Sequence, residues 1–185
     1  NNKKMSRIGK LPVVLPEKVE AKILDRVLEI KWPLWVLKLE FNPLVSVKIE
    51  DNSIIVTPND LENALSKALW WTTRANINNM VVGVSQWYNK SLEIVWVWYK
   101  FELAWNNLVL SIGYSHKVDM VTPAGITLKA DEKNKNIVHF SSIDKQLLWE
   151  FVAKVRAKKK PEPYKWKWIK YVWEVIRRKA WKSGK

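Results

Sequence analysis

The sequence predicts an α+β fold of two duplicated domains, each a mainly antiparallel sheet with one helix packed on it. Strand-like runs separated by turn residues occur in two series, and a helical pattern follows each series. The chain of 185 residues is also long enough for two units of about 75 to 100 residues. We place the boundary after residue 82, which gives domains 1–82 and 83–185.

The first series of strands is predicted from runs rich in Val, Ile and Leu. They are KVEAKIL (18–24), VLEIK (27–31), VLKLEF (36–41), VSVKIE (45–50) and SIIVTP (53–58). Asn59 and Asp60 are good N-cap residues, and the apolar stripe after them predicts a helix that starts there and extends to about residue 88.

The second series repeats this order. Strands are predicted in LEIVWVWYKF (92–101), NLVLSIGY (107–114), HKVDMVT (116–122), GITLKA (125–130) and NIVHF (136–140). Apolar residues at i, i+3, i+4 and i+7 from Leu148 predict a helix within residues 141–159, and IKYVWEVI (169–176) predicts a last strand.

A displacement of 81 residues superimposes the two series. It places Leu37 on Val118 and Val47 on Leu128. With three extra residues in the second hairpin, Asp60 then falls on Asp144, so both would begin a helix. The same displacement places Trp32 on Gly113, as if the two occupied equivalent turns.

Composition excludes several classes of function. The chain has no Cys, so it has neither disulfides nor thiolate metal sites, and no apolar run reaches the roughly 20 residues that span a bilayer. The first sixteen residues lack the apolar core of a signal peptide. His116 and His139 are the only histidines, and neither has ligand spacing. We therefore expect a soluble intracellular protein without catalytic residues, bound metal, cofactor or small-molecule substrate.

The positive charge is concentrated near the end of the sequence. Residues 1–82 carry 12 basic and 9 acidic side chains, residues 83–150 carry 7 of each, and residues 151–185 carry 13 basic and 2 acidic. Of the net charge of +14, +11 thus lies in the last 35 residues. Such a cluster favours a polyanionic partner over a plain solvated tail, because the apolar residues among the charges are of types that packing orders.

The stretch PEPYKWKWIKY (161–171) alternates lysine with tryptophan. It is consistent with a platform that stacks nucleic-acid bases, with a basic segment that lies on a membrane surface, or with tryptophans written in place of another residue. The whole chain has 13 Trp and only 5 Gly, whereas glycine is normally about 7% of residues. Many of these tryptophans fall in turns or basic loops, where an indole finds little to pack against, although an authentically Trp-rich protein remains an alternative.

Four segments resemble the family of bacterial-type protein six of the large ribosomal subunit. They are MSRIGKLPVVLP (5–16), LWWTTRANINNMVVGVS (69–85), LVLSIGYSHKV (108–118) and KPEPYKWKWIKY (160–171). The likeness runs from Met5 to the end of the sequence, and residues 161–169 are close to the family signature Pro-Glu-Pro-Tyr-Lys-Gly-Lys-Gly-Ile. Residues 1–4 lie outside the family pattern and are consistent with upstream sequence read through to an earlier start.

The departures from the family follow one rule. Family glycines are written here as Trp32, Trp35, Trp71, Trp87, Trp96, Trp98, Trp105, Trp149, Trp166, Trp168, Trp173 and Trp181. Only Trp70 stands where family members can carry tryptophan. A gene in which UGA specifies glycine, translated with UGA as tryptophan, accounts for all twelve positions. Glycine at 166 and 168 would let the backbone approach phosphates closely.

The resemblance implies a structural protein of the bacterial-type, cytoplasmic ribosome that binds large-subunit ribosomal RNA, chiefly through its second domain. It also implies neighbouring ribosomal proteins and a position near the translation-factor docking site and the stalk base. The predicted RNA-binding residues are Lys158, Lys159, Lys160, Tyr164, Lys165, Trp166, Lys167, Trp168, Lys170, Arg177, Arg178, Lys179 and Lys182. The alternative function is a basic, Trp-rich protein of a membrane surface.

Several of these residues also have ordinary structural interpretations. The helix dipole alone favours lysines such as Lys158 at a helix C-terminus, and Tyr164 would equally fill the core. For Arg7, Lys10 and Arg74 we favour a solvated surface charge over RNA contact. For His116 a turn-stabilising role is as good an interpretation as RNA contact.

Overall fold

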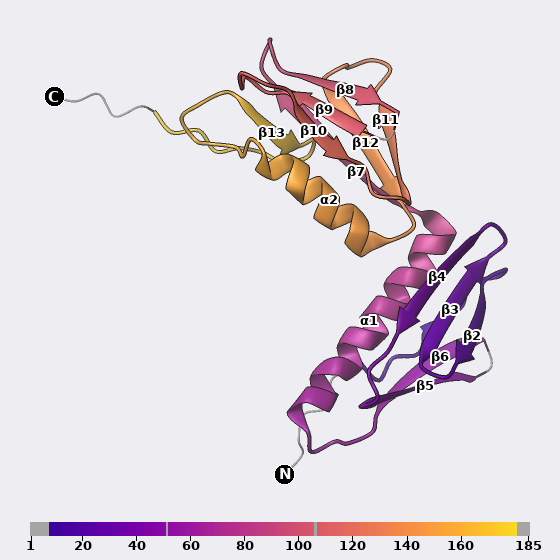
Figure 1. Ribbon diagram of the computed structural model, residues 1–185. Coiled ribbons are helices and arrows are strands. Elements are labelled where there is room, and N and C mark those ends of the chain that lie inside the picture. Colours follow the sequence, from indigo (N-terminus) through magenta and orange to yellow (C-terminus); the bar gives the residue numbers. More distant parts are fainter. Residues whose placement is uncertain (1–7, 51, 106, 181–185) are drawn as a thin grey trace. The chain divides into compact units, whose positions relative to one another are not determined.

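The computed structural model describes residues 8–50, 52–105 and 107–180 (Figure 1). Within this part of the chain two compact units meet between Trp87 and Tyr88. The boundary expected after residue 82 falls inside the helix that ends the first unit. Some predictions from the sequence concern residues outside the described part of the chain, namely residues 1–4, Arg7, Trp181 and Lys182.

The first unit, up to Trp87, contains two three-stranded antiparallel sheets and one helix. One sheet has the order β2-β3-β4, with β2 at Glu20–Leu24, β3 at Val27–Trp32 and β4 at Trp35–Glu40. The other has the order β1-β6-β5, with β1 at Val13–Val14, β5 at Val45–Glu50 and β6 at Ser53–Pro58. Helix α1 spans Ala64–Gln86 and contacts strands of both sheets (Figure 1).

Helix α1 begins four residues later than its predicted start at Asp60. Its N-cap is Asn63, whose side chain accepts a hydrogen bond from the backbone N–H of Leu65 at 2.9 Å. Asp60 instead accepts from the backbone N–H of Glu62 at 2.7 Å in the preceding turn. Short polar side chains serve both kinds of turn, and the sequence pattern did not distinguish them.

The second unit, from Tyr88, contains a three-stranded and a four-stranded antiparallel sheet. The first has the order β10-β9-β8, with β8 at Lys100–Ala104, β9 at Asn107–Ser111 and β10 at Val118–Val121. The second has the order β11-β12-β7-β13, with β7 at Tyr88–Val95, β11 at Ile126–Ala130, β12 at Ile137–Ser142 and β13 at Trp168–Tyr171. Helix α2 spans Lys145–Ala157.

The duplicated α+β fold is confirmed, with the refinement that the strands of each unit form two sheets. Equivalent elements keep nearly constant spacing: β2 and β8 begin at Glu20 and Lys100, and the N-caps of α1 and α2 are Asn63 and Asp144. The equivalence of Asp60 with Asp144 was therefore wrong. The second unit does have three extra residues between β11 and β12, as predicted. Its connection from β12 to α2 is shorter by the same number than the connection from β6 to α1, so the two helices start at the original displacement.

The pairing registers also correct the equivalence of Trp32 with Gly113. Leu37 corresponds to Val118, as predicted. Their pairing partners are Ile30 in the first unit and Leu110 in the second, so β9 is displaced from β3 by 80 residues and not 81. Trp32 thus corresponds to the buried Ile112. It lies in β3 without a positive φ, so it does not occupy a glycine-type turn.

The predicted strand at residues 92–101 is broken in two. Residues 96–99 form a turn in which the backbone N–H of Tyr99 donates to the carbonyl of Trp96 at 3.3 Å. Trp96 and Trp98 therefore lie in this turn and not in the predicted strand. Strand β13 is likewise shorter than predicted, because a turn follows Tyr171.

Strand β13 has no counterpart among the described residues of the first unit. It pairs antiparallel with β7, with Ile169 opposite Ile94 and Lys170 opposite Glu93. It adds the fully buried Ile169 to the core of the second unit. The basic segment near the end of the sequence is therefore partly built into the sheet.

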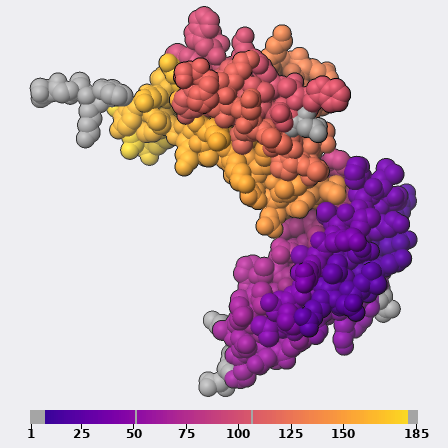
Figure 2. All heavy atoms as spheres, in the orientation of Figure 1, coloured from indigo at the N-terminus to yellow at the C-terminus, as the bar shows by residue number. Residues whose placement is uncertain are grey.

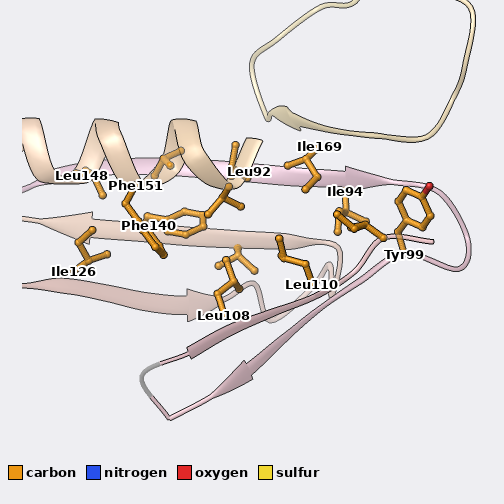
Figure 3. Packing of buried hydrophobic residues seen from close by; sticks show 14 residues of the cluster. Leu92, Ile94, Tyr99, Leu108, Leu110, Ile126, Phe140, Leu148, Phe151 and Ile169 are labelled. Carbon is orange, nitrogen blue, oxygen red and sulfur yellow. The ribbon is translucent and has the colours of Figure 1, made fainter. Parts of the chain in front are cut away.

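Each unit has its own hydrophobic core. In the second unit Leu148 and Phe151 of α2 point toward Phe140 and Leu92 of the four-stranded sheet (Figure 3). Leu108 and Leu110 of β9 belong to the same cluster. Burial of each such side chain contributes about 1.5–3 kcal/mol to folding, which fixes α2 and the segment after it.

Candidate nucleic-acid interface

The C-terminal end of α2 presents the first three predicted RNA-binding lysines. Lys158 is the C-cap residue, and Lys159 and Lys160 follow it. Two of the carbonyls exposed at this end have partners: the Tyr114 hydroxyl donates to Lys158 O at 3.1 Å, and the Ile169 N–H donates to Lys159 O at 2.9 Å. The position of these lysines is thereby tied to the β9–β10 connection and to β13.

These lysines line an open groove with a volume of about 780 Å³. Its other walls come from the turn between β7 and β8, the β9–β10 connection and the loop before β13. The lining residues are Trp96, Tyr99, Gly113, Tyr114, Ala157, Lys158, Lys159, Lys160, Glu162, Lys165, Trp166 and Lys167. Five of the twelve are lysines, against one glutamate, so the groove suits an anionic ligand.

Gly113 sets the shape of one wall of the groove. Its φ is +75°, a conformation that residues with a Cβ rarely adopt, and an added Cβ would lie 2.9 Å from the ring of Tyr99. Tyr99 is buried in the core of the second unit. Glycine at this position therefore allows the β9–β10 connection to lie directly on that ring.

Cations in and beside the loop from 161 to 167 lie close to one carboxylate and to two indoles. Lys165 Nζ lies 3.7 Å from a carboxylate oxygen of Glu162. Lys167 Nζ lies 4.3 Å from the ring centroid of Trp96, and the guanidinium carbon of Arg178 lies 3.2 Å from that of Trp166. Two of the predicted RNA-binding cations thus contact tryptophans.

The segment after β13 is anchored to α2 by an ion pair. The Arg156 guanidinium hydrogen-bonds both carboxylate oxygens of Glu174, with Nε to Oε2 at 3.0 Å, and the Tyr171 N–H donates to Oε2 at 3.1 Å. The hydrogen bond from Arg156 holds the pKa of Glu174 below its ordinary value, and Glu174 in turn raises the pKa of Arg156. Farther along, the Lys179 N–H donates to Pro163 O at 3.1 Å. Both contacts hold this segment against the second unit, and Figure 2 shows its yellow spheres at the surface.

The structure separates the predicted RNA-binding residues into three groups. Exposed cations are Lys158, Lys160, Lys165, Lys167, Arg177, Arg178 and Lys179, and Lys159 is half-buried in the groove wall. Tyr164 and Trp166 are exposed in the same loop. Lys170 is half-buried and Trp168 is buried, so neither belongs to this exposed surface.

Lys170 and Trp168 lie in β13 and not in the loop. Lys170 Nζ is 3.1 Å from a carboxylate oxygen of Glu93 on the neighbouring strand, and its side chain is only 21% exposed. Trp168 is 2% exposed, so its side chain faces the interior and not a surface ligand. Because side chains two residues apart lie on the same face of a strand, Trp168 and Lys170 share one face of β13, and Ile169 lies on the other.

The tryptophans that the structure describes differ sharply in their surroundings. Trp70 is buried and its indole N–H donates to Val56 O at 2.6 Å. Trp168 is buried, and its indole N–H has no hydrogen-bond partner among the residues that the structure describes. Trp87, the C-cap of α1, has φ 56° and ψ 150°, a combination that is essentially restricted to glycine. Trp105 has φ 50° and is fully exposed. Of these tryptophans, Trp70 has the surroundings that a buried indole requires.

One polar cluster was not predicted from the sequence. Ser91 Oγ lies 2.7 Å from His139 Nδ1, and His139 Nε2 lies 3.1 Å from Asp131 Oδ2. Backbone N–H groups of Asn134 and Lys133, together with His139, lower the pKa of Asp131 to about 2. Ser91 and His139 are cross-strand partners of β7 and β12, so only the pairing register, which the sequence does not show, could have revealed the cluster.

Among residues 8–50, 52–105 and 107–180, no three His, Asp or Glu side chains gather as a metal site would require. In the same part of the chain, α1 and α2 are both too short or too polar to cross a bilayer. The segment that could have formed a membrane-surface helix instead contains strand β13.

Comparison with known proteins shows the family. The model of the family described as ribosomal protein L6 matches residues 15–86 and 98–172. The large ribosomal subunit protein uL6 of Clostridium novyi is 44% identical over 98% of this chain and 100% of its own length. Those of Carboxydothermus hydrogenoformans and Trichlorobacter lovleyi are 45% and 46% identical, over 97% and 98% of this chain and 97% and 99% of their own lengths. The resemblance seen in the sequence is thereby confirmed, and the chain belongs to the ribosomal protein L6 family, which consists of structural components of the large ribosomal subunit and not of enzymes.

Proposed function

We propose that the second unit binds large-subunit ribosomal RNA through the groove and the cationic segment beside it. The observation that supports this most directly is the convergence of Lys158, Lys159, Lys160, Lys165 and Lys167 on one groove. Lysine contacts to phosphate are largely independent of sequence, so the fold of the RNA would supply the specificity. The first unit, with its lower net charge, would face other partners or solvent.

The proposal extends to the position in the subunit. The family resemblance supports a place near the translation-factor docking site and the base of the stalk, beside neighbouring ribosomal proteins. Chemical footprinting of assembled subunits with and without this chain would test it. Protection confined to RNA far from the docking site would contradict the position without affecting RNA binding.

Salt dependence measures the phosphate contacts directly. We would titrate the purified chain with protein-free large-subunit ribosomal RNA at several salt concentrations and plot log K against log salt. Each phosphate contact contributes about −0.7 to −0.9 to the slope. Lys167→Gln should therefore make the slope shallower by about that amount. Lys100→Gln is the matched control, because Lys100 is exposed on β8 of the same unit but does not line the groove.

The same titration distinguishes the alternative function. Equal slopes for Lys167→Gln, Lys100→Gln and the unchanged chain would show that the groove contacts no phosphate. A parallel experiment replaces the RNA with anionic phospholipid vesicles. Vesicle binding without RNA binding would overturn the proposal in favour of the membrane-surface function.

We also infer that the twelve tryptophans at family glycine positions are glycines in the native protein, through a reassigned UGA codon. The backbone of Trp87 and Trp105 and the unpartnered indole of Trp168 support this. Glycine at 96 and 166 would also release Lys167 and Arg178 from the indoles that they contact. Both cations would then be available to phosphates in the groove.

Mass spectrometry of the native protein tests the decoding. An intact mass well below 21.8 kDa and glycine at position 166 in peptide fragments are expected. Genuine tryptophan at that position would refute the decoding. RNA binding would still be testable, because Lys158, Lys159 and Lys160 line the groove and contact neither Trp96 nor Trp166 in the cation–π pairs of that loop.

A further inference from the structure

The β9–β10 connection is wider than the fold requires. In the first unit the equivalent hairpin is closed tightly, since Lys31 pairs with Val36 and Trp32 with Trp35. In the second unit pairing stops at Leu110 and Val118, two steps earlier. The second unit therefore forgoes strand pairing that its duplicate makes, and loops that a fold does not require commonly serve a function.

The widened connection presents two aromatic rings beside the groove. The rings of Tyr114 and His116 are stacked, with centroids 6.1 Å apart and an interplanar angle of 15°. Tyr114 is 49% exposed and His116 is also exposed. Aromatic side chains owe much of their contribution to the area that they bury, so exposed rings leave such area open to a ligand.

The ring of Tyr114 is held in place from the groove side. Its hydroxyl donates to Lys158 O, and Lys159 Nζ lies 4.8 Å from the ring centroid. Gly113, which precedes it, fixes the backbone against Tyr99. The next lysine along, Lys117, is paired with Glu102 at 2.7 Å, whereas Lys159 at the end of α2 contacts the ring of Tyr114.

We propose that the Tyr114–His116 ring pair stacks on an unpaired base of the ribosomal RNA whose phosphates the groove lysines contact. This rests on the proposed RNA binding and adds to it a contact with a base face. Aromatic side chains beside a cationic groove recognise single-stranded nucleotides in this way, because every base offers a π face. The unpaired nucleotide would lie over the rings, with its phosphate toward Lys158 and Lys159.

The test compares three variants with the unchanged chain, using protein-free large-subunit ribosomal RNA as the probe. Tyr114→Leu should weaken binding by about 5- to 150-fold, the loss expected for one stacked base. His116→Leu should weaken it in the same direction. Tyr114→Phe keeps the ring and loses only the hydroxyl, so it should bind within a few-fold of the unchanged chain. None of the three should alter the salt slope, since no cation is removed.

The outcomes separate this inference from the proposed function. If the unchanged chain shows no salt-dependent RNA binding, both fail. If it binds and Tyr114→Leu and His116→Leu bind equally well, only the stacking inference fails. If Tyr114→Phe loses as much affinity as Tyr114→Leu, the hydroxyl bond to Lys158 is what matters, and stacking is likewise refuted. A normal thermal melt for each variant confirms that the loss is not unfolding, and His116→Leu still decides should Tyr114→Leu fail to fold.

Discussion

Replacing Trp105 by glycine should stabilise the second unit of the chain. Trp105 has φ 50° and its side chain is fully exposed, so the indole gains no packing in return for the left-handed backbone. That conformation costs a residue with a Cβ about 1–2 kcal/mol. Glycine removes the cost but brings more freedom to the unfolded chain, which offsets about 0.4–1 kcal/mol. The net gain is about 1 kcal/mol, or about 4–8 °C in the melting temperature of a unit of this size.

Two further substitutions calibrate this experiment. Trp98 is also largely exposed, at 78%, but its φ is not positive, so Trp98→Gly should lower the melting temperature slightly. Trp70→Gly removes a buried indole that donates to Val56 O and should cost the first unit at least about 3–5 kcal/mol. Differential scanning calorimetry would follow the two units as separate transitions. A melting temperature for Trp105→Gly at or below that of Trp98→Gly would refute the reasoning.

Three other predictions concern polar contacts. Asp144→Ala removes the N-cap of α2, which accepts from the Gln146 and Leu147 N–H groups, and should cost about 1 kcal/mol in chemical denaturation. Glu174→Gln should cost about 1–3 kcal/mol and speed proteolysis after β13; unchanged cleavage would contradict the anchoring role of its bond to Arg156. The pKa of Asp131 is lowered from 3.8 to about 2, so its contribution is complete above pH 3.8 and is lost as pH falls toward 2. Asp131→Asn should therefore flatten the melting temperature over that interval, and an equally steep acid profile would count against the assignment.

The sequence was sufficient for the fold because its signals were local and repeated. Alternation in runs such as VSVKIE and the apolar stripe from Leu148 depend on residues close in the chain, and β5 and α2 formed where these patterns lay. The errors came where local signals were ambiguous. Asp60 and Asn63 are both good caps, and LEIVWVWYKF has no turn residue as written, although the chain turns at 96–99.

The candidate site was predictable in its charge but not in its arrangement. Lysine clustering marked residues 158–167, yet nothing local indicated that Lys170 would pair with Glu93 or that Trp168 would be buried. Both follow from the register of β13 against β7, which joins residues far apart in sequence. Contacts between residues far apart in sequence also form the groove wall at Gly113 and Tyr114 and join Ser91 to His139. Local patterns could not predict either feature.

Strand β13 joins the proposed ligand-facing segment to the interior of its unit. A chain that ends before Trp168 would lack strand β13, so one edge of β7 would be unpaired. It would also lack Ile169 in the core and the strand that holds the end of the lysine-rich loop. A loss of RNA binding in such a deletion variant could then come from unfolding of the second unit as well as from the missing RNA contacts. Neutralising one cation at a time separates the two, and an engineered tag or fusion belongs beyond Lys179, after both the Arg156–Glu174 ion pair and the Lys179–Pro163 hydrogen bond.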